Sequence, residues 1–285
     1  MTTQDGRRNE VMPSTVEPKT ETVSSSSSSG NRGGSPSQPV APRRARPEQE
    51  SRILHQTAFV LHRYLYKETS LIVEIFSREY GRVALVAKGA KRAHSRLRGV
   101  LHTFQPLSLG WSGKSELRNL IAAEWVGGLV PLENSALLYG FYLNELLLKL
   151  IAREDPHPAL FDHYVATLAQ LANTESAPIV LRKFELALLK ETGVAADLSV
   201  CTASGQAVDP DEVYIVEPES GPRPARMSDV APRVSGKTLQ DMAGENYSDP
   251  TTQMQSKLLM RFLLAHHLGG EQIKTRQILI DLMQL

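Results

Sequence analysis

The chemistry that this chain offers most clearly lies in a run of positively charged side chains between residues 82 and 99. The run holds six cations and neither Asp nor Glu; they are Arg82, Lys88, Lys91, Arg92, Arg96 and Arg98. Lysine and arginine neutralise phosphates, and each such contact releases counterions condensed on a nucleic acid. Most runs of charged residues simply face the solvent and bind nothing. This run, however, contains charges of one sign only and adjoins predicted strands. It therefore predicts a nucleic-acid site, and Arg118 is a weaker member of the same set.

Two aromatic side chains near these cations are candidates for stacking on bases. Tyr64 and Trp111 neighbour polar residues and turns, so we predict that both are exposed. Stacking of a base on an exposed aromatic ring contributes about 1–3 kcal/mol in proteins that bind single strands. Packing in the core is an equally good interpretation of both residues, and it is the better one for Phe59 and Phe76.

Catalytic groups are weakly indicated. His266 and His267 are adjacent on a predicted helix, so their side chains diverge by about 100° and cannot share a metal ion. No phosphate-binding GxxxxGK[ST] loop is present. The acids Glu154, Asp155 and Asp162 leave one alternative open, a nucleic-acid-processing enzyme with a recognition module. That alternative requires a group of acids or a metal site beside the basic run.

The elements that must position the basic run read as short strands. Five segments rich in β-branched and aromatic residues predict strands over residues 58–66, 70–76, 82–89, 104–113 and 116–127. Five short strands without a long helix among them favour a small closed barrel, and the OB-fold is the leading candidate. Pro106 favours an edge position for the fourth strand, because proline cannot donate to a sheet ladder.

After Pro131 the apolar residues recur with a helical period. The spacing predicts helices over residues 136–153, 159–173, 178–191, 250–268 and 275–285, with an irregular excursion at 194–235. The fold class is therefore α+β with more than one domain, an N-terminal OB-fold barrel over 52–131 and a C-terminal helical domain over 132–285. Residues 1–51 are rich in Ser, Pro and Arg, and we predict a disordered tail.

The net charge of +1 for 285 residues hides an uneven distribution. Residues 52–131 hold 12 Lys/Arg against 5 Asp/Glu, whereas residues 132–285 hold 13 against 20. The basic half would attract phosphates, and the acidic half is better suited to protein partners. No apolar run reaches the ~20 residues of a membrane-spanning helix. A single cysteine, Cys201, excludes an internal disulfide and suits a reducing cytoplasm.

Several stretches together closely resemble the RecO family of bacterial DNA repair and recombination mediators. The resemblance spans roughly residues 58–285, and its strongest stretches, in the family's order, are AFVLHRYLYKETS, YGRVALVAKGAKR, FYLNELLLKL, LRKFELALLKETG and LLMRFLLAHHLGG. The resemblance implies a protein without catalysis that binds single- and double-stranded DNA and anneals complementary strands. It also implies partnership with RecR and with single-stranded-DNA-binding protein (SSB), so that recombinase can load, in the bacterial cytoplasm near the nucleoid.

The resemblance implies that the acidic and apolar C-terminal tail of SSB docks on the helical domain. Apolar side chains flanked by cations would suit that ligand, and a simple helix–helix interface is an equally good interpretation of each residue. The candidates are Tyr142, Leu146, Arg182, Lys183 and Phe184. Some family members carry a four-cysteine zinc site in the excursion, but here Cys201 is alone. One thiolate cannot close a tetrahedral site, so we predict no metal and no cofactor.

Overall fold

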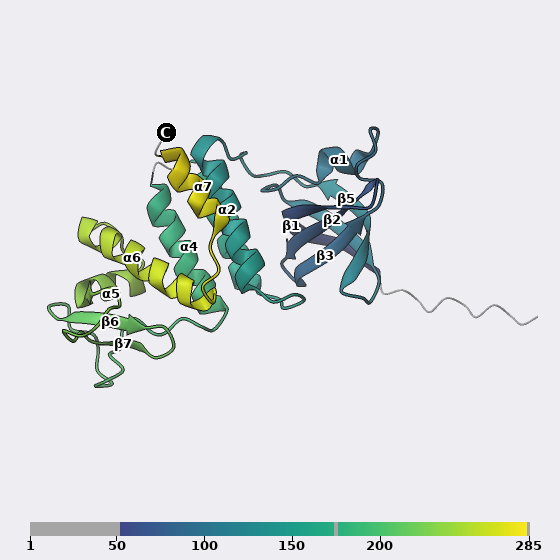
Figure 1. Cartoon of the computed structure of the whole chain (residues 1–285). Helices are drawn as coiled ribbons and strands as arrows, with labels where there is room; N and C mark the ends of the chain where they lie inside the picture. Colours follow the sequence, from purple (N-terminus) through teal and green to yellow (C-terminus); the bar gives the residue numbers. More distant parts are fainter. Residues whose placement is uncertain (1–51, 174–175, 284–285) are drawn as a thin grey trace, which may run out of the picture. The chain divides into compact units, whose positions relative to one another are not determined.

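The computed structural model describes residues 52–173 and 176–283 (Figure 1). The predicted disordered tail, residues 1–51, lies outside the described residues. No helix in the described ranges is long and apolar enough to cross a membrane.

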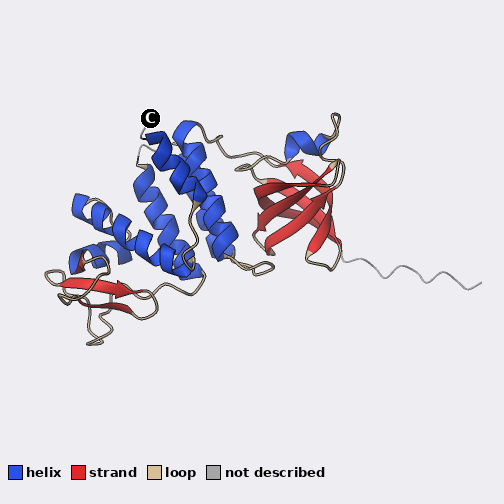
Figure 2. Cartoon of the chain, in the orientation of Figure 1, coloured by secondary structure: helices blue, strands red, loops and turns tan. Residues whose placement is uncertain are grey.

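The N-terminal part is a closed five-stranded barrel (Figure 2). Its strands are β1 (Arg52–Tyr66), β2 (Ser70–Ser77), β3 (Gly81–Ala87), β4 (Leu107–Ser112) and β5 (Leu117–Trp125), and the short helix α1 (Arg96–Val100) lies between β3 and β4. The order around the barrel is β1-β2-β3-β5-β4, in which only the β3–β5 pairing is parallel. The prediction of a small closed barrel from strand spacing is confirmed.

The fourth strand does not lie at an edge, so that prediction is wrong. β4 pairs with β1 on one side and with β5 on the other. Pro106 stands just before Leu107, the first residue of the strand, so its missing N–H removes no ladder bond. Its carbonyl accepts a hydrogen bond from the Val126 N–H at 3.1 Å.

Residues 58–61 of β1 and 73–77 of β2 are buried on both faces of the strands. Side chains such as Val60 and Ile75 face the barrel interior. Phe59 and Phe76 face the other way and join the hydrophobic core of the helical region. Because successive side chains of a strand alternate between faces, one hydrophobic run supplies two cores.

Among the described residues, the helical region contains the five predicted helices and one that was not predicted. The predicted ones are α2 (Asn134–Leu150), α3 (Pro158–Leu171), α4 (Ala177–Glu191), α6 (Pro250–His267) and α7 (Lys274–Met283). The additional helix is α5 (Gly236–Ala243), whose N-cap residue Ser235 accepts a hydrogen bond from the Thr238 N–H. At eight residues it is too short for a clear period in the sequence.

The excursion at 194–235 is not wholly irregular, which corrects the prediction. It contains an antiparallel sheet in the order β7-β6-β8, formed by β6 (Val213–Glu217), β7 (Gly221–Pro224) and β8 (Val234–Ser235). Tyr214, Val216 and Val234 pack into the helical core, so the excursion is held by apolar contacts. Two prolines in β7 conceal the strand in the sequence, and they are tolerated because β7 is an edge strand.

Polar and aromatic contacts join the barrel to the helices. The Phe161 ring lies 5.6 Å from that of Phe59 and 5.4 Å from that of Phe76. Asn144, which is buried, donates to the Leu61 carbonyl at 2.9 Å and accepts from the Tyr164 hydroxyl at 2.6 Å. The bulge in β1 between Val60 and His62 interrupts the ladder beside Leu61, whose carbonyl takes this side-chain donor instead.

We predict that Gly81→Ala destabilises the protein more than Gly205→Ala. Both glycines have a positive φ, +63° and +67°, so both substitutions carry a backbone cost of about 1 kcal/mol. Only at Gly81 would a Cβ lie 2.0 Å from the carbonyl oxygen of Asp155, whereas nothing lies within 4 Å at Gly205. Urea unfolding should show an additional loss of more than about 1 kcal/mol for Gly81→Ala. Equal losses would contradict this close approach between β3 and the segment after α2.

Candidate nucleic-acid interface

The segment between β3 and the end of α1 presents a group of exposed cations, which we call the basic loop. Its members are Lys88, Lys91, Arg92, Arg96 and Arg98, and all five are exposed. Within the described ranges none of the five makes an ion pair. Their charge is therefore available to a ligand.

The basic loop is fixed to the barrel along its apolar side. The Lys91 N–H donates to the Thr69 carbonyl in the β1–β2 turn at 2.9 Å. Ala90 and Leu101 are buried in the barrel core, and Leu97 packs against it. The apolar residues of the segment thus hold it in place while its cations stay in solvent, which limits the ordering entropy that a bound strand must offset.

Two other cations of the predicted DNA-binding set, Arg82 and Arg118, bind groups within the protein. The Arg82 guanidinium is half-buried and donates to the Leu148 carbonyl of α2, and burial lowers its pKa. Arg118 pairs with Glu154 at 2.6 Å. Both side chains join the barrel to the helical region, so Arg82 and Arg118 are removed from the predicted DNA-binding set. The sequence could not reveal this, because their partners lie 36 or more positions away.

The two aromatic residues that were predicted to stack on bases differ in their exposure to solvent. Trp111 is fully buried inside the barrel, where its ring meets that of Tyr80 edge-on at 5.3 Å. The prediction that Trp111 stacks on a base is therefore wrong. Tyr64 is 46% exposed, its ring lies 4.4 Å from that of His62, and it remains a candidate.

The acids that supported an enzymatic alternative serve the structure. Asp162 pairs with Arg78 at 2.9 Å, and the hydrogen bond from this guanidinium lowers the pKa of the carboxyl. Glu154 pairs with Arg118 as described above. Across the described ranges no three His, Cys, Asp or Glu residues come together in a way that could hold a metal ion. Glu154 and Asp162 thus link the helical region to the barrel, whereas Asp155 is exposed and lies 3.2 Å from His157 Nε2.

Sequence reasoning missed cations beside the basic loop. Lys67 is exposed in the β1–β2 turn, two residues from Thr69, to which the loop is bonded. Its ammonium lies 5.2 Å from the centre of the Tyr66 ring. Arg63 is also exposed and donates to the Leu101 carbonyl at 3.0 Å. The hydrogen bond that brings turn and loop together has no signature in the sequence.

A second candidate site is a cleft of about 370 Å³ in the helical region, which we call the helical cleft. Its lining combines apolar side chains with cations and amides, and includes Tyr142, Leu181, Arg182, Lys257, Arg261, Leu264, Leu268, Gln272, Ile273, Arg276 and Gln277. Of the predicted partner-binding residues, Tyr142 and Arg182 line it. Leu146 and Phe184 are buried in the core, so their prediction as contact residues is wrong. Lys183 lies outside the cleft and pairs with Glu245 at 3.7 Å.

The charge of the helical cleft is mainly positive. Glu185 is fully buried behind Tyr142, from whose hydroxyl it accepts a hydrogen bond at 2.6 Å, and it also pairs with Arg182. Burial raises the pKa of this carboxyl. Glu271 also lines the cleft and pairs with Lys149.

The remaining cations of the helical cleft have no such partner. Lys257, Arg261 and Arg276 form no ion pair within the described ranges. Burial, and next the charge of Arg261, lowers the pKa of Arg276. The sequence contains a signal for two of these residues. Lys257 and Arg261 are one helical turn apart, so a helix places them on the same face. Their proximity to α7 was not predictable.

Comparison with known proteins identifies the family. The model for "Recombination protein O N terminal" matches residues 52–129, and the model for "Recombination protein O C terminal" matches residues 133–277. The chain belongs to the RecO family. The family's members are DNA repair mediators rather than enzymes.

Three relatives, each named DNA repair protein RecO, illustrate how far this RecO-family similarity extends. The protein of Ralstonia nicotianae is 56% identical over 250 residues, which cover 86% of this chain and 92% of the relative. That of Burkholderia pseudomallei is 57% identical over 247 residues, covering 86% and 90%. That of Polynucleobacter necessarius is 52% identical over 240 residues, covering 82% and 98%. The matches thus include both the barrel and the helical region.

We predict that Arg153→Ala costs far more stability than Arg78→Ala, although both break an ion pair between barrel and helices. Arg153 pairs with Glu74, whose side chain is only 4% exposed, so its removal leaves a buried carboxylate without its cation. The expected loss in urea unfolding is roughly 3 kcal/mol. Arg78 and Asp162 are 44% and 58% exposed, and their pair should contribute less than about 1 kcal/mol.

The double variant Arg153→Ala with Glu74→Gln provides the control. A neutral amide costs less to bury than a carboxylate, so the double variant should recover part of the lost stability. No recovery would indicate that Arg153 stabilises the interface through packing alone.

Proposed function

We propose that this RecO-family protein binds single- and double-stranded DNA through the basic loop, largely without sequence preference. The observation that carries the proposal is the group of five exposed cations without an acidic partner in the described ranges, held on a rigid barrel. Contacts to phosphates position a nucleic acid but carry no sequence information. Lys67 and Arg63 beside the loop extend the same charge, and Tyr64 offers an exposed ring.

We infer that annealing of complementary strands follows from the same charge without any chemical step. Two strands repel each other through their phosphates, and a cationic surface lowers that repulsion and raises their local concentration. Release of condensed counterions supplies much of the binding free energy, so the activity should weaken as salt rises.

We also propose that the helical cleft receives the acidic and apolar C-terminal tail of SSB. The apolar side chains of its lining suit the hydrophobic residues of such a tail, and Lys257, Arg261 and Arg276, which form no ion pair in the described ranges, suit its carboxylates. Contact with SSB would bring the protein to SSB-coated DNA, where it helps recombinase to load together with RecR. Partnership with RecR rests on family membership alone, as does a location in the bacterial cytoplasm near the nucleoid.

We predict that neutralising three cations of the basic loop, as K88Q, R92Q and R96Q together, weakens single-strand binding by about tenfold or more at low salt. The slope of log K against log salt should become less steep by about 2, because roughly 0.7 of an ion is released per lost phosphate contact. Fluorescence anisotropy of a labelled oligothymidylate at several salt concentrations measures both quantities.

The matched control replaces three exposed cations far along the sequence, as K190Q, R226Q and R233Q. It removes the same net charge, so it should change the slope much less. If the two triple variants behave alike, the loss reflects total charge and the basic loop is not the DNA site.

We predict that Arg276→Ala weakens binding of a synthetic peptide with an acidic, apolar C-terminus by about tenfold or more, because a charge-assisted hydrogen bond is lost. Lys183→Ala is the control, since Lys183 lies outside the helical cleft and is a cation of the same region. Titration calorimetry with the peptide measures both. Equal losses for the two variants would place the peptide elsewhere.

A further inference from the structure

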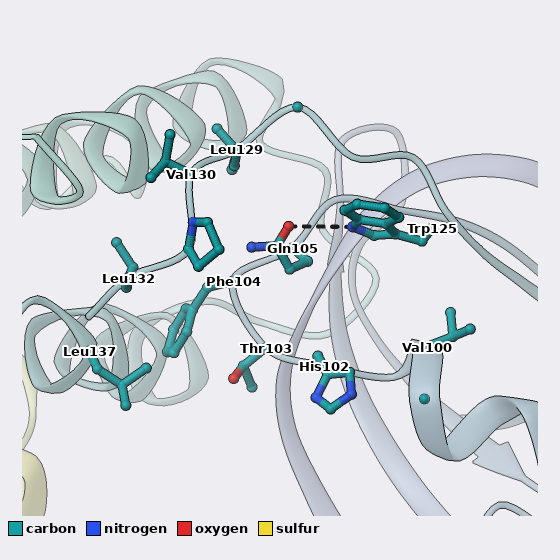
Figure 3. A pocket seen from close by; sticks show the side chains of 13 residues that line it. Val100, His102, Thr103, Phe104, Gln105, Trp125, Leu129, Val130, Leu132 and Leu137 are labelled. Atoms are coloured by element: carbon teal, nitrogen blue, oxygen red, sulfur yellow. Dashed lines mark hydrogen bonds between the residues drawn. The ribbon is translucent and has the colours of Figure 1, made fainter. Parts of the chain in front are cut away.

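A groove of about 760 Å³ lies next to the basic loop and is used by neither proposed activity (Figure 3). It is bounded by the end of α1, the segment 102–105, the last residue of β5 and the connection that leads to α2. Most of its lining is apolar, but His102, Thr103 and Gln105 add an imidazole, a hydroxyl and an amide.

Trp125, the last residue of β5, is the large aromatic surface of this groove. Its side chain is 66% exposed, although tryptophan is usually buried for much of its area. The indole N–H donates to Gln105 Oε1 at 3.3 Å, which restrains the ring, as Figure 3 shows. Gly127 lies against the ring, and a Cβ there would stand 3.7 Å from it. Glycine at this position therefore leaves the ring uncovered on that side.

The charges around the groove indicate which ligand it suits. α1 carries Arg96 and Arg98, its next residues Gly99 and Val100 line the groove, and the helix contacts β5. A DNA strand whose phosphates lie on the basic loop would therefore pass the groove. No Lys or Arg is among the described residues that line the groove, so the groove itself offers a phosphate no cation. An uncharged, flat group with polar edges fits this lining best.

We propose that the groove is a stacking site for an unpaired nucleobase. The base would lie on the Trp125 indole, and Gln105, Thr103 and His102 would face its polar edges. The inference rests on the proposed binding of DNA by the basic loop and deepens it. In a duplex every base is stacked and paired, so only a single strand can fill the groove. The site would thus bind an unpaired strand but not a strand that is already paired in a duplex.

The two tryptophans of the chain provide the first test, because Trp111 is fully buried and Trp125 is exposed. Stacking on Trp125 should quench part of the fluorescence, while Trp111 reports an unchanged core. The probes are an oligothymidylate and an abasic oligonucleotide of equal length. We expect quenching by the first and none by the second, although both carry the same phosphates. In the full chain with Trp125→Phe this quenching should disappear.

Affinity provides the second test. Trp125→Ala should weaken binding of the oligothymidylate by about 5-fold to 100-fold, leave binding of the abasic strand unchanged and keep the salt slope. Val126→Ala is the matched control, because Val126 is exposed beside Trp125 but does not line the groove. Near-ultraviolet circular dichroism and thermal unfolding of each variant check that the barrel is intact.

The outcomes separate this inference from the proposed function. If the wild-type protein binds DNA with a steep salt slope, yet quenching is equal with the abasic strand or Trp125→Ala binds as tightly as wild type, the stacking site is refuted and DNA binding stands. The groove would then suit an apolar protein segment better. If the wild-type protein binds neither oligonucleotide, or binds both with an affinity that the basic-loop variant leaves unchanged, the proposed function itself fails.

Discussion

The rest of the structure depends on the burial of β1 and β2 from both sides. Val60 and Ile75 close the barrel from inside, and Phe59 and Phe76 pack against the Phe161 ring from outside. A strand pair that belongs to two cores cannot shift its register without exposing apolar side chains on both faces. The β1–β2 turn is therefore fixed, and through the bond between Lys91 and Thr69 so is the basic loop.

Cations in this chain have two distinct roles, which their surroundings decide. Arg82, Arg118 and Arg153 lie where the barrel meets the helices, and a carbonyl or a carboxylate of the other part holds each of them. No acidic side chain in the described ranges pairs with the basic loop, so its charge stays available. Charge that is neutralised inside the protein contributes to folding, and only the remainder is available to a polyanion.

The sequence was sufficient for the barrel, for the longer helices and for the basic loop, because period and composition are local properties. It failed where one residue's role depends on a distant partner. Trp111 and Trp125 are both aromatic residues of predicted strands, yet one is buried and the other exposed, and the bulge between Gly110 and Trp111 that shifts the register is invisible beforehand. The same reason explains why Leu146 and Phe184 were mistaken for surface contacts, since a helical period does not tell which neighbour covers an apolar face.

The edge strand β7 has a consequence for how the protein behaves at high concentration. An open sheet edge with free N–H groups can recruit a strand from another molecule. Pro222 and Pro224 have no N–H to offer, and the Pro222 carbonyl already accepts hydrogen bonds from both the Thr202 N–H and its hydroxyl. On the opposite edge, β8 is only two residues long. Both edges of this sheet are thereby protected from pairing with a strand of another copy.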